Sequence, residues 1–352
     1  MLALVVVLLL LILIVANRAD KSVSLRPVIY FLLLLINGGL LIVYGFTPII
    51  RATQGQTLGA ITISMANAEV GLAIAALFAL VATLLLFERV RRPLTRIFPR
   101  AATGEGDSIH SSGFDPASIT HMIAMVYCIY LLAETILEFV LAGGLSGLTD
   151  QLKASNAGGL SLLTPSSVLE QLAIWVGVAT FGAGLFTRRS WADVRRRLGL
   201  RWPTVQELWI SLAMSGGLIV FAFIVGIIWQ IITPPNTYNQ QTQLSQLIAG
   251  GVNTLSFAFL IAFCAAVGEE IAFRGALQPI FGLWPTAIFF ALTHVQYTLT
   301  PATLLIVGVA LGLGWLRRRY NTTAAIVAHF AYDFTLLALT LYLRYMQTMV
   351  GK

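Results

Sequence analysis

The stretch ELWISLAMSGGLIVFAFIVGIIWQII, residues 207–232, decides the fold class of this chain. Its one charged side chain, Glu207, stands at the first position, and the rest is almost wholly apolar. An α-helix rises about 1.5 Å per residue, so roughly 20 apolar residues cross the hydrocarbon core of a bilayer. Backbone polar groups in lipid must find their partners within the segment, and the run therefore predicts a transmembrane helix.

The rest of the chain repeats this pattern. Of its 352 residues 58% are hydrophobic and only 11% are charged, whereas a soluble domain carries about 25% charged residues. The apolar runs give ten candidate spans, at about 1–16, 27–48, 69–88, 120–143, 168–187, 207–232, 253–275, 284–298, 301–316 and 322–344. No segment alternates with period two over about ten residues, as the strands of a membrane barrel do. We therefore predict an all-α, polytopic membrane helix bundle of about ten transmembrane helices.

The net charge of +7 is explained by membrane topology. With the first N-terminus placed outside, most of the 22 Lys and Arg residues fall in the inner segments 17–26, 88–119, 188–206, 275–283 and 317–321. This is the positive-inside pattern of multi-pass proteins of the cell membrane. It accounts for the basic balance without nucleic acid as a partner, and it leaves the inner loops free to touch anionic membrane lipid.

The stretch AATGEGDSIHSSGFDPAS, residues 101–118, predicts a flexible linker because it is rich in Gly, Ser and Asp. It divides the chain into residues 1–118, a three-span N-terminal region plus a cytoplasmic linker, and residues 119–352, a seven-span region. The first run, MLALVVVLLLLILIVAN, has no positively charged start and no small-residue cleavage site, which favours a retained anchor over a signal peptide.

The stretch VGEEIAFRGALQ, residues 267–278, places charges inside a predicted span, where ionisable groups usually serve a function. Six such groups fall on the seventh, eighth and tenth spans: Glu269, Glu270, Arg274, His294, His329 and Asp333. Glu270 and Arg274 are four residues apart and can pair on one helix face, as can His329 and Asp333. By helical rise they lie roughly 7 to 17 Å from the inner span ends, so that they could meet in one pocket.

These side chains are the parts of a hydrolase that attacks a carbonyl with activated water. The glutamate paired with Arg274 would stay ionised, and the other could act as a general base on water. One histidine could orient that water, and the second could donate to a developing oxyanion. The residues alone do not decide which glutamate is the base.

A metal is the less favoured alternative. Two histidines with carboxylates could bind zinc or another divalent metal. The sequence contains no HExxH motif, and Arg274 beside the glutamates would repel a cation. We therefore expect no cofactor.

Three motifs in order resemble a known family. EEIAFR (269–274) fits EExxxR, FALTH (290–294) fits FxxxH, and HFAYD (329–333) fits HxxxN with Asp in the last place. The chain resembles the CAAX prenyl endopeptidase and bacteriocin-processing (CPBP) family of glutamate-type intramembrane proteases over about 252–345. VRRRLGLRWPT (194–204) also looks like the lead-in of bacterial members, whereas residues 1–118 show no family pattern.

The resemblance implies a helical membrane protease whose pocket opens toward the cytosol. By position in the motifs, Glu269 and His294 would activate the water, and His329 with Asp333 would form the oxyanion hole. Glu270 and Arg274 would brace the site.

Asp333 departs from the family pattern, since an asparagine amide donates a hydrogen bond and an ionised aspartate cannot. It could be protonated, it could hold His329 as an imidazolium, or the activity could be weakened or lost.

The predicted function is an intramembrane endopeptidase that acts on a peptide or membrane-protein substrate. The alternative is a non-catalytic membrane scaffold or immunity-type protein that retains the pocket as a binding site. An ion-coupled transporter would predict internal repeats, and the sequence shows none.

Two further acids, Glu134 and Glu138, could line the pocket, bind a cation or lie near the outer headgroups. His121 lies at a span start and is expected to be solvated.

Overall fold

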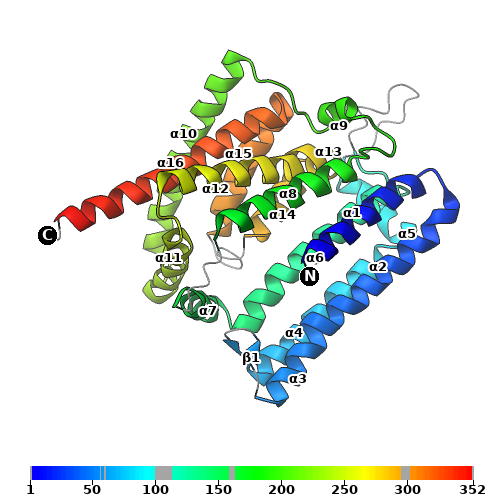
Figure 1. Cartoon of the computed structure of the whole chain (residues 1–352), viewed down its shortest axis with the longest axis horizontal. Helices are drawn as coiled ribbons and strands as arrows, with labels where there is room; N and C mark the ends of the chain where they lie inside the picture. Colours follow the sequence, from blue (N-terminus) through cyan, green and yellow to red (C-terminus); the bar gives the residue numbers. More distant parts are fainter. Residues whose placement is uncertain are drawn as a thin grey trace.

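The computed structural model describes residues 2–55, 57–58, 61–99, 113–157, 163–294 and 302–350, so that most of the predicted linker lies outside the described residues. The described chain is almost entirely helical (Figure 1). The strands β1 (Thr57–Leu58) and β2 (Ile61–Thr62) form a short antiparallel pair that joins two helices. The predicted all-α class is confirmed, with this pair as a local exception.

Each predicted span overlaps a helix of the described residues, although several of these helices end before the span does. The N-terminal region contains α1 (Leu2–Ala19), α2 (Arg26–Leu40), η2 (Leu41–Phe46), α3 (Thr47–Thr53), α4 (Met65–Leu84) and α5 (Glu88–Arg91). The middle contains α6 (Ile119–Ala142), α7 (Leu145–Ala157), α8 (Pro165–Gly182), α9 (Trp191–Arg197), α10 (Val205–Ile232) and α11 (Pro235–Gly250). The last part contains α12 (Leu255–Glu269), η4 (Glu270–Leu277), α13 (Gln278–Phe281), α14 (Leu283–Leu292), α15 (Thr303–Arg319) and α16 (Thr322–Val350).

The predicted number of about ten transmembrane helices was too high. Among the described residues, six helices are long and apolar enough to cross a membrane: Val23–Thr53, Met65–Leu84, Ile119–Ala142, Val205–Ile232, Leu255–Phe281 and Thr322–Met349. The apolar stretches Val7–Ala19 and Leu283–Leu292 are shorter. Apolar runs in sequence overestimate the count because some helices end before the run ends.

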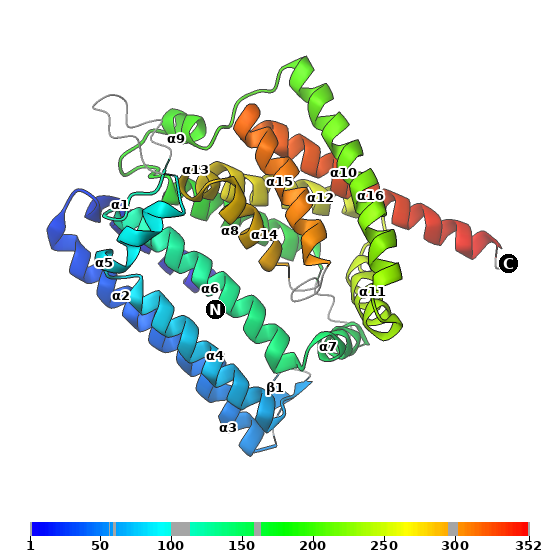
Figure 2. The same cartoon turned by 180° about the vertical axis from the view of Figure 1, so that it is seen from behind.

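Two main apolar cores, with two small clusters between α4 and α6 beside them, hold the described helices together. The larger core joins α1, α2, α4, α6, α8, η4 and α14, and it includes Ile12, Met122 and Phe273. The smaller core lies between α10, α15 and α16 around Leu218 and Leu313. Figures 1 and 2 show α1, α2, α4 and α6 on one side and α10, α15 and α16 on the other, with α8 and α12 between them.

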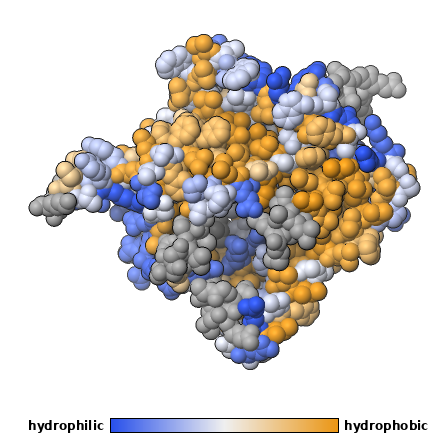
Figure 3. Space-filling model, viewed as in Figure 1, coloured by the Kyte–Doolittle hydropathy of each residue, from blue (hydrophilic) through white to orange (hydrophobic). Residues whose placement is uncertain are grey.

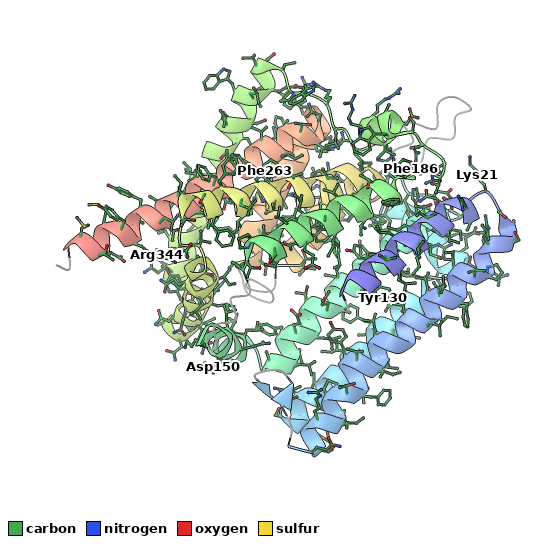
Figure 4. The ribbon with its side chains drawn as sticks, in the orientation of Figure 1. Lys21, Tyr130, Asp150, Phe186, Phe263 and Arg344 are labelled. Carbon is green, nitrogen blue, oxygen red and sulfur yellow. The ribbon has the colours of Figure 1, made fainter. Side chains whose placement is uncertain are left out.

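The bundle has two distinct ends. Lys21 and Phe186 lie at one end, where the arginine-rich segments gather, and Asp150 and Arg344 lie toward the other (Figure 4). We call the first the basic end. Between the ends, apolar side chains cover most of the visible face (Figure 3). Phe31 and Val220 are 62% and 58% exposed, as expected for side chains that meet lipid.

Two helical segments, η2 and η4, have the wider π geometry, and each ends two residues before a proline, Pro48 or Pro279. Proline has no N–H, and its ring crowds the carbonyl four residues earlier. For Pro279 that carbonyl belongs to Gly275, and Arg197 Nη1 donates to it over 3.4 Å. Pro279 therefore helps to place an arginine of the basic end against the helix of the EExxxR motif.

Asp20 fastens the end of α1 to the start of α6. Its carboxylate accepts from the backbone N–H of Ile119 over 2.6 Å and pairs with Arg188 Nη1 at 2.9 Å. A carboxylate at a helix N-terminus satisfies N–H groups that have no partner within the helix and interacts favourably with the helix dipole. Asp20 therefore ties α1 and the segment after α8 to α6.

We expect Asp20→Ala to lower the free energy of unfolding by about 2 kcal/mol, because it removes this cap and leaves Arg188 without its carboxylate. Chemical unfolding of the purified protein in detergent measures the change. Asp150→Ala is the matched control, since Asp150 is 77% exposed and lies 3.9 Å from Lys153. Its effect should stay below about 0.5 kcal/mol. Equal effects of the two variants would contradict the assigned role of Asp20.

Candidate active site

Glu270 and Arg274 form a buried ion pair on η4. The Glu270 and Arg274 side chains are 0% and 1% exposed, and Arg274 Nη1 lies 3.1 Å from Glu270 Oε1. Arg274 Nη2 donates to the Ala310 carbonyl of α15 over 3.3 Å, and the guanidinium lies 4.3 Å from the centre of the Phe290 ring. Burying two charges is costly unless each is compensated, and these contacts supply part of the compensation. The predicted pairing of Glu270 with Arg274 is confirmed.

His329 of α16 extends this pair into a linear chain of polar groups. Its Nδ1 lies 2.9 Å from Glu270 Oε1, and its Nε2 lies 3.2 Å from Asp333 Oδ2. The predicted contact of His329 with Asp333 is confirmed, and the contact with Glu270 is an addition that helical spacing could not reveal. Because both ring nitrogens face carboxylate oxygens, the arrangement suits an imidazolium that donates in both directions.

His294 follows α14 instead of lying within it. The predicted span 284–298 is wrong at this point, since α14 ends at Leu292 and the His294 N–H closes a turn onto the Ala291 carbonyl over 3.2 Å. The His294 ring Nδ1 lies 2.8 Å from the Phe290 carbonyl oxygen. A carbonyl only accepts, so Nδ1 carries a proton. Nε2 is then the nitrogen that can take up a proton.

Glu269, the last residue of α12, is half-buried and lies within electrostatic reach of His294, His329 and Asp333. The structure therefore brings the six predicted residues into one group, which we call the Glu–His cluster.

The Phe290 ring packs at the centre of this cluster. Its centre lies 4.6 Å from the His294 ring and 6.4 Å from the His329 ring, in addition to its contact with Arg274. The sequence identified Phe290 only as the first residue of the FxxxH motif, whereas its ring packs against Arg274 and both histidines.

Hydrogen bonds near the basic end brace the helices of the cluster, and one of them comes from the segment 194–204. The Leu198 carbonyl accepts from Thr322 Oγ1 over 2.5 Å, at the first residue of α16. Arg317 Nε donates to the Arg274 carbonyl over 3.1 Å, and Gln278 Nε2 donates to the Gly314 carbonyl over 2.8 Å. These bonds link η4, α13, α15 and α16, so that the residues of the cluster meet in a defined geometry.

Two polar atoms of the cluster remain unsatisfied. Glu270 Oε2 and Arg274 Nη1 are buried and have no hydrogen-bond partner among the described residues, because Nη1 approaches Oε1 without hydrogen-bond geometry. Unsatisfied buried groups are rare in folded proteins and often mark functional sites.

Across the described part of the chain, no three His, Cys, Asp or Glu side chains are grouped as metal ligands.

The second pair of membrane acids lies elsewhere. Glu134 and Glu138 are exposed on α6, close enough to Tyr44 of η2 to act on it electrostatically. They lie on α6, which contributes none of the six residues of the cluster.

The fold and the cluster define a multi-pass helical membrane protein with a buried polar centre of the kind that hydrolases use. Residues 251–335 match the family model described as type II CAAX prenyl endopeptidase, Rce1-like. This segment contains all three motifs. Over these residues the match confirms the resemblance to CAAX protease-like membrane hydrolases. Comparisons with curated proteins and with solved structures gave no match.

Proposed function

We propose that this protein is an intramembrane endopeptidase that hydrolyses a peptide bond with glutamate-activated water. The observation that carries the proposal is the chain Arg274–Glu270–His329–Asp333, with Glu269 and His294 beside it, on segments that match a protease family. A buried set of acids, bases and fixed donors is the arrangement that general acid–base catalysis needs.

In the proposed mechanism Glu269 and His294 take the proton from a water molecule that attacks the scissile carbonyl. His294 suits this role because its Nδ1–H is held by the Phe290 carbonyl, which directs the basic character to Nε2. As the amide carbon becomes tetrahedral, the Nε2–H of His329 would be shared between Asp333 Oδ2 and the oxyanion, which it would stabilise. The captured proton then passes to the leaving amine, and the new carboxylate takes the oxygen of the water.

Glu270 and Arg274 support this centre without touching the substrate. Glu270 Oε1 contacts both Arg274 and His329 Nδ1, and it therefore keeps the histidine charged and oriented. The Asp333 side chain is 27% exposed, so that a carbonyl oxygen can approach the outer side of the His329–Asp333 contact.

We place the basic end at the cytoplasmic face of the cell membrane, following the positive-inside rule. The cluster would then be reached from the cytoplasmic side, and the substrate would be a peptide or a membrane protein.

The experiment is cleavage of a panel of membrane-derived peptides by the purified protein, with and without a chelator, with Glu269→Ala as the reference. Cleavage that depends on Glu269 and ignores the chelator supports the proposal. Cleavage that the chelator abolishes would assign the site to zinc or another divalent metal. A folded wild-type protein that cleaves none of the peptides would favour the non-catalytic scaffold or immunity-type protein, for which Asp333 in place of asparagine is the supporting observation.

We expect the peptide-cleavage rate of Asp333→Asn to stay within about tenfold of the wild-type rate. The asparagine carbonyl can still accept from His329 Nε2–H, and its amide adds a donor for the oxyanion. Asp333→Leu keeps neither function and should be much slower. Both rates are measured on the same peptide. A loss in Asp333→Asn as large as in Asp333→Leu would show that the carboxylate charge itself is required.

A further inference from the structure

A second polar centre lies at the basic end, away from the Glu–His cluster. A cavity of about 540 Å³ opens between α1, α6, α8 and η4, within the size range of ligand sites. None of the six residues of the Glu–His cluster lines it. Residues of η4 such as Ala272 and Ala276 form one wall, so that the cavity and the cluster share a helix.

The cavity is amphipathic along its length. Apolar side chains that include Leu9, Leu13 and Trp175 line one part, and charged side chains that include Asp20 and Arg188 line the part at the basic end, which we call its mouth. From Leu9 to Asp20 the helical rise amounts to about 16 Å. A ligand that fills this space therefore needs a polar head at the basic end and an apolar chain that reaches into the membrane region.

The charge at the mouth is unbalanced. Five cationic residues line it (Lys21, Arg26, Arg188, Arg189 and Arg197), against two acidic residues (Asp20 and Asp115). Both acids are already engaged, since Asp20 caps α6 and Asp115 Oδ1 accepts from the Ala117 N–H over 2.9 Å. His121 adds no charge while its Nδ1 accepts from the Asp115 N–H over 3.0 Å, and it is half-buried, contrary to the solvated position expected for it.

Arg188 pairs with Asp20, whose carboxylate also accepts from the start of α6, so that one carboxylate serves two partners. Arg197 Nη1 and Arg26 Nε donate to backbone carbonyls, which carry no net charge. Arg188 Nε is buried without a hydrogen-bond partner among the described residues. Burial, together with the nearby arginines 189, 317 and 188, lowers the pKa of Arg197 to about 10, as a crowded set of cations does.

We propose that this cavity binds an anionic membrane lipid, with its phosphate against Arg188 and Arg197 and one acyl chain along Leu13 and Trp175. Arginine is suited to phosphate because its planar fork can make two charge-assisted hydrogen bonds. Basic pockets between membrane helices on the cytoplasmic side bind anionic headgroups in this way. The inference does not depend on proteolysis, since it uses none of the residues assigned to hydrolysis.

The test is native mass spectrometry of the full chain in detergent, titrated with dioleoyl phosphatidylglycerol, dioleoyl phosphatidylcholine or glycerol phosphate. We expect the phosphatidylglycerol complex to be at least about tenfold tighter than the phosphatidylcholine complex, and to weaken as salt is raised. Arg197→Gln should weaken it about fivefold. Ala124→Trp, which fills the apolar part, should weaken it more than tenfold.

Arg318→Gln is the matched control, since Arg318 is an exposed arginine of the same end that does not line the cavity, and its lipid affinity should equal that of wild type. Equal weakening by Arg197→Gln and Arg318→Gln would overturn the proposal in favour of diffuse surface charge. Glycerol phosphate binding as tightly as the lipid, with no effect of Ala124→Trp, would overturn it in favour of a small-anion site. The salt dependence of wild type needs no variant, and an affinity that does not change with salt would also overturn it.

Discussion

Purified Glu269→Gln protein should cleave peptide at least about 10³-fold more slowly than wild type and unfold at nearly the same denaturant concentration. The amide keeps the shape of the side chain but cannot accept a proton from water, and general-base catalysis contributes about 10²- to 10⁴-fold. Stability should change little, because Glu269 is half-buried and the buried Glu270–Arg274 pair remains intact. Initial rates and unfolding curves on one preparation measure both quantities.

Glu134→Gln is the control for this prediction. It neutralises another membrane glutamate, exposed on α6, and should keep the wild-type rate. The double variant Glu269→Gln/His294→Ala should be no slower than the slower single variant if both side chains act on the same water. A Glu269→Gln protein that cleaves at the wild-type rate would show that the base is another group or that the protein is not a glutamate-type protease.

Helical periodicity was sufficient to predict the pairs within one helix, Glu270 with Arg274 and His329 with Asp333. These contacts depend only on four-residue spacing, which holds even though η4 has π geometry. The contact between Glu270 and His329 joins residues 59 positions apart. It depends on how η4 and α16 pack, and periodicity carries no information about packing.

The position of His294 shows a second limit of sequence reasoning. The predicted span ran past Leu292 to residue 298, whereas the helix ends at Leu292 and His294 closes a turn. The cavity at the basic end was also not predicted. Its cationic residues come from segments separated in sequence, and each alone is typical of an inner loop that follows the positive-inside rule.

The Glu270→Leu variant should lose about 3 to 5 kcal/mol of folding free energy, far more than any change at its neighbour Glu269. Glu270 Oε1 is the carboxylate contact of both Arg274, which is 1% exposed, and His329 Nδ1. Removing one partner of a buried pair leaves an uncompensated charge, which costs this much in measured cases. Denaturant unfolding in detergent gives the difference, with Glu269→Leu as the matched control at the adjacent position.

The double variant Glu270→Leu/Arg274→Met separates the cost of a stranded charge from the loss of packing. Buried ion pairs replaced by apolar side chains of similar volume are often as stable as the original. We therefore expect the double variant to recover most of the lost stability, while His329 keeps Asp333 as its one carboxylate partner. It should still cleave more slowly than wild type, since His329 Nδ1 then has no anchor. If Glu270→Leu is no less stable than Glu269→Leu, then Glu270 does not neutralise Arg274 and His329, and the cluster is not held together by charge.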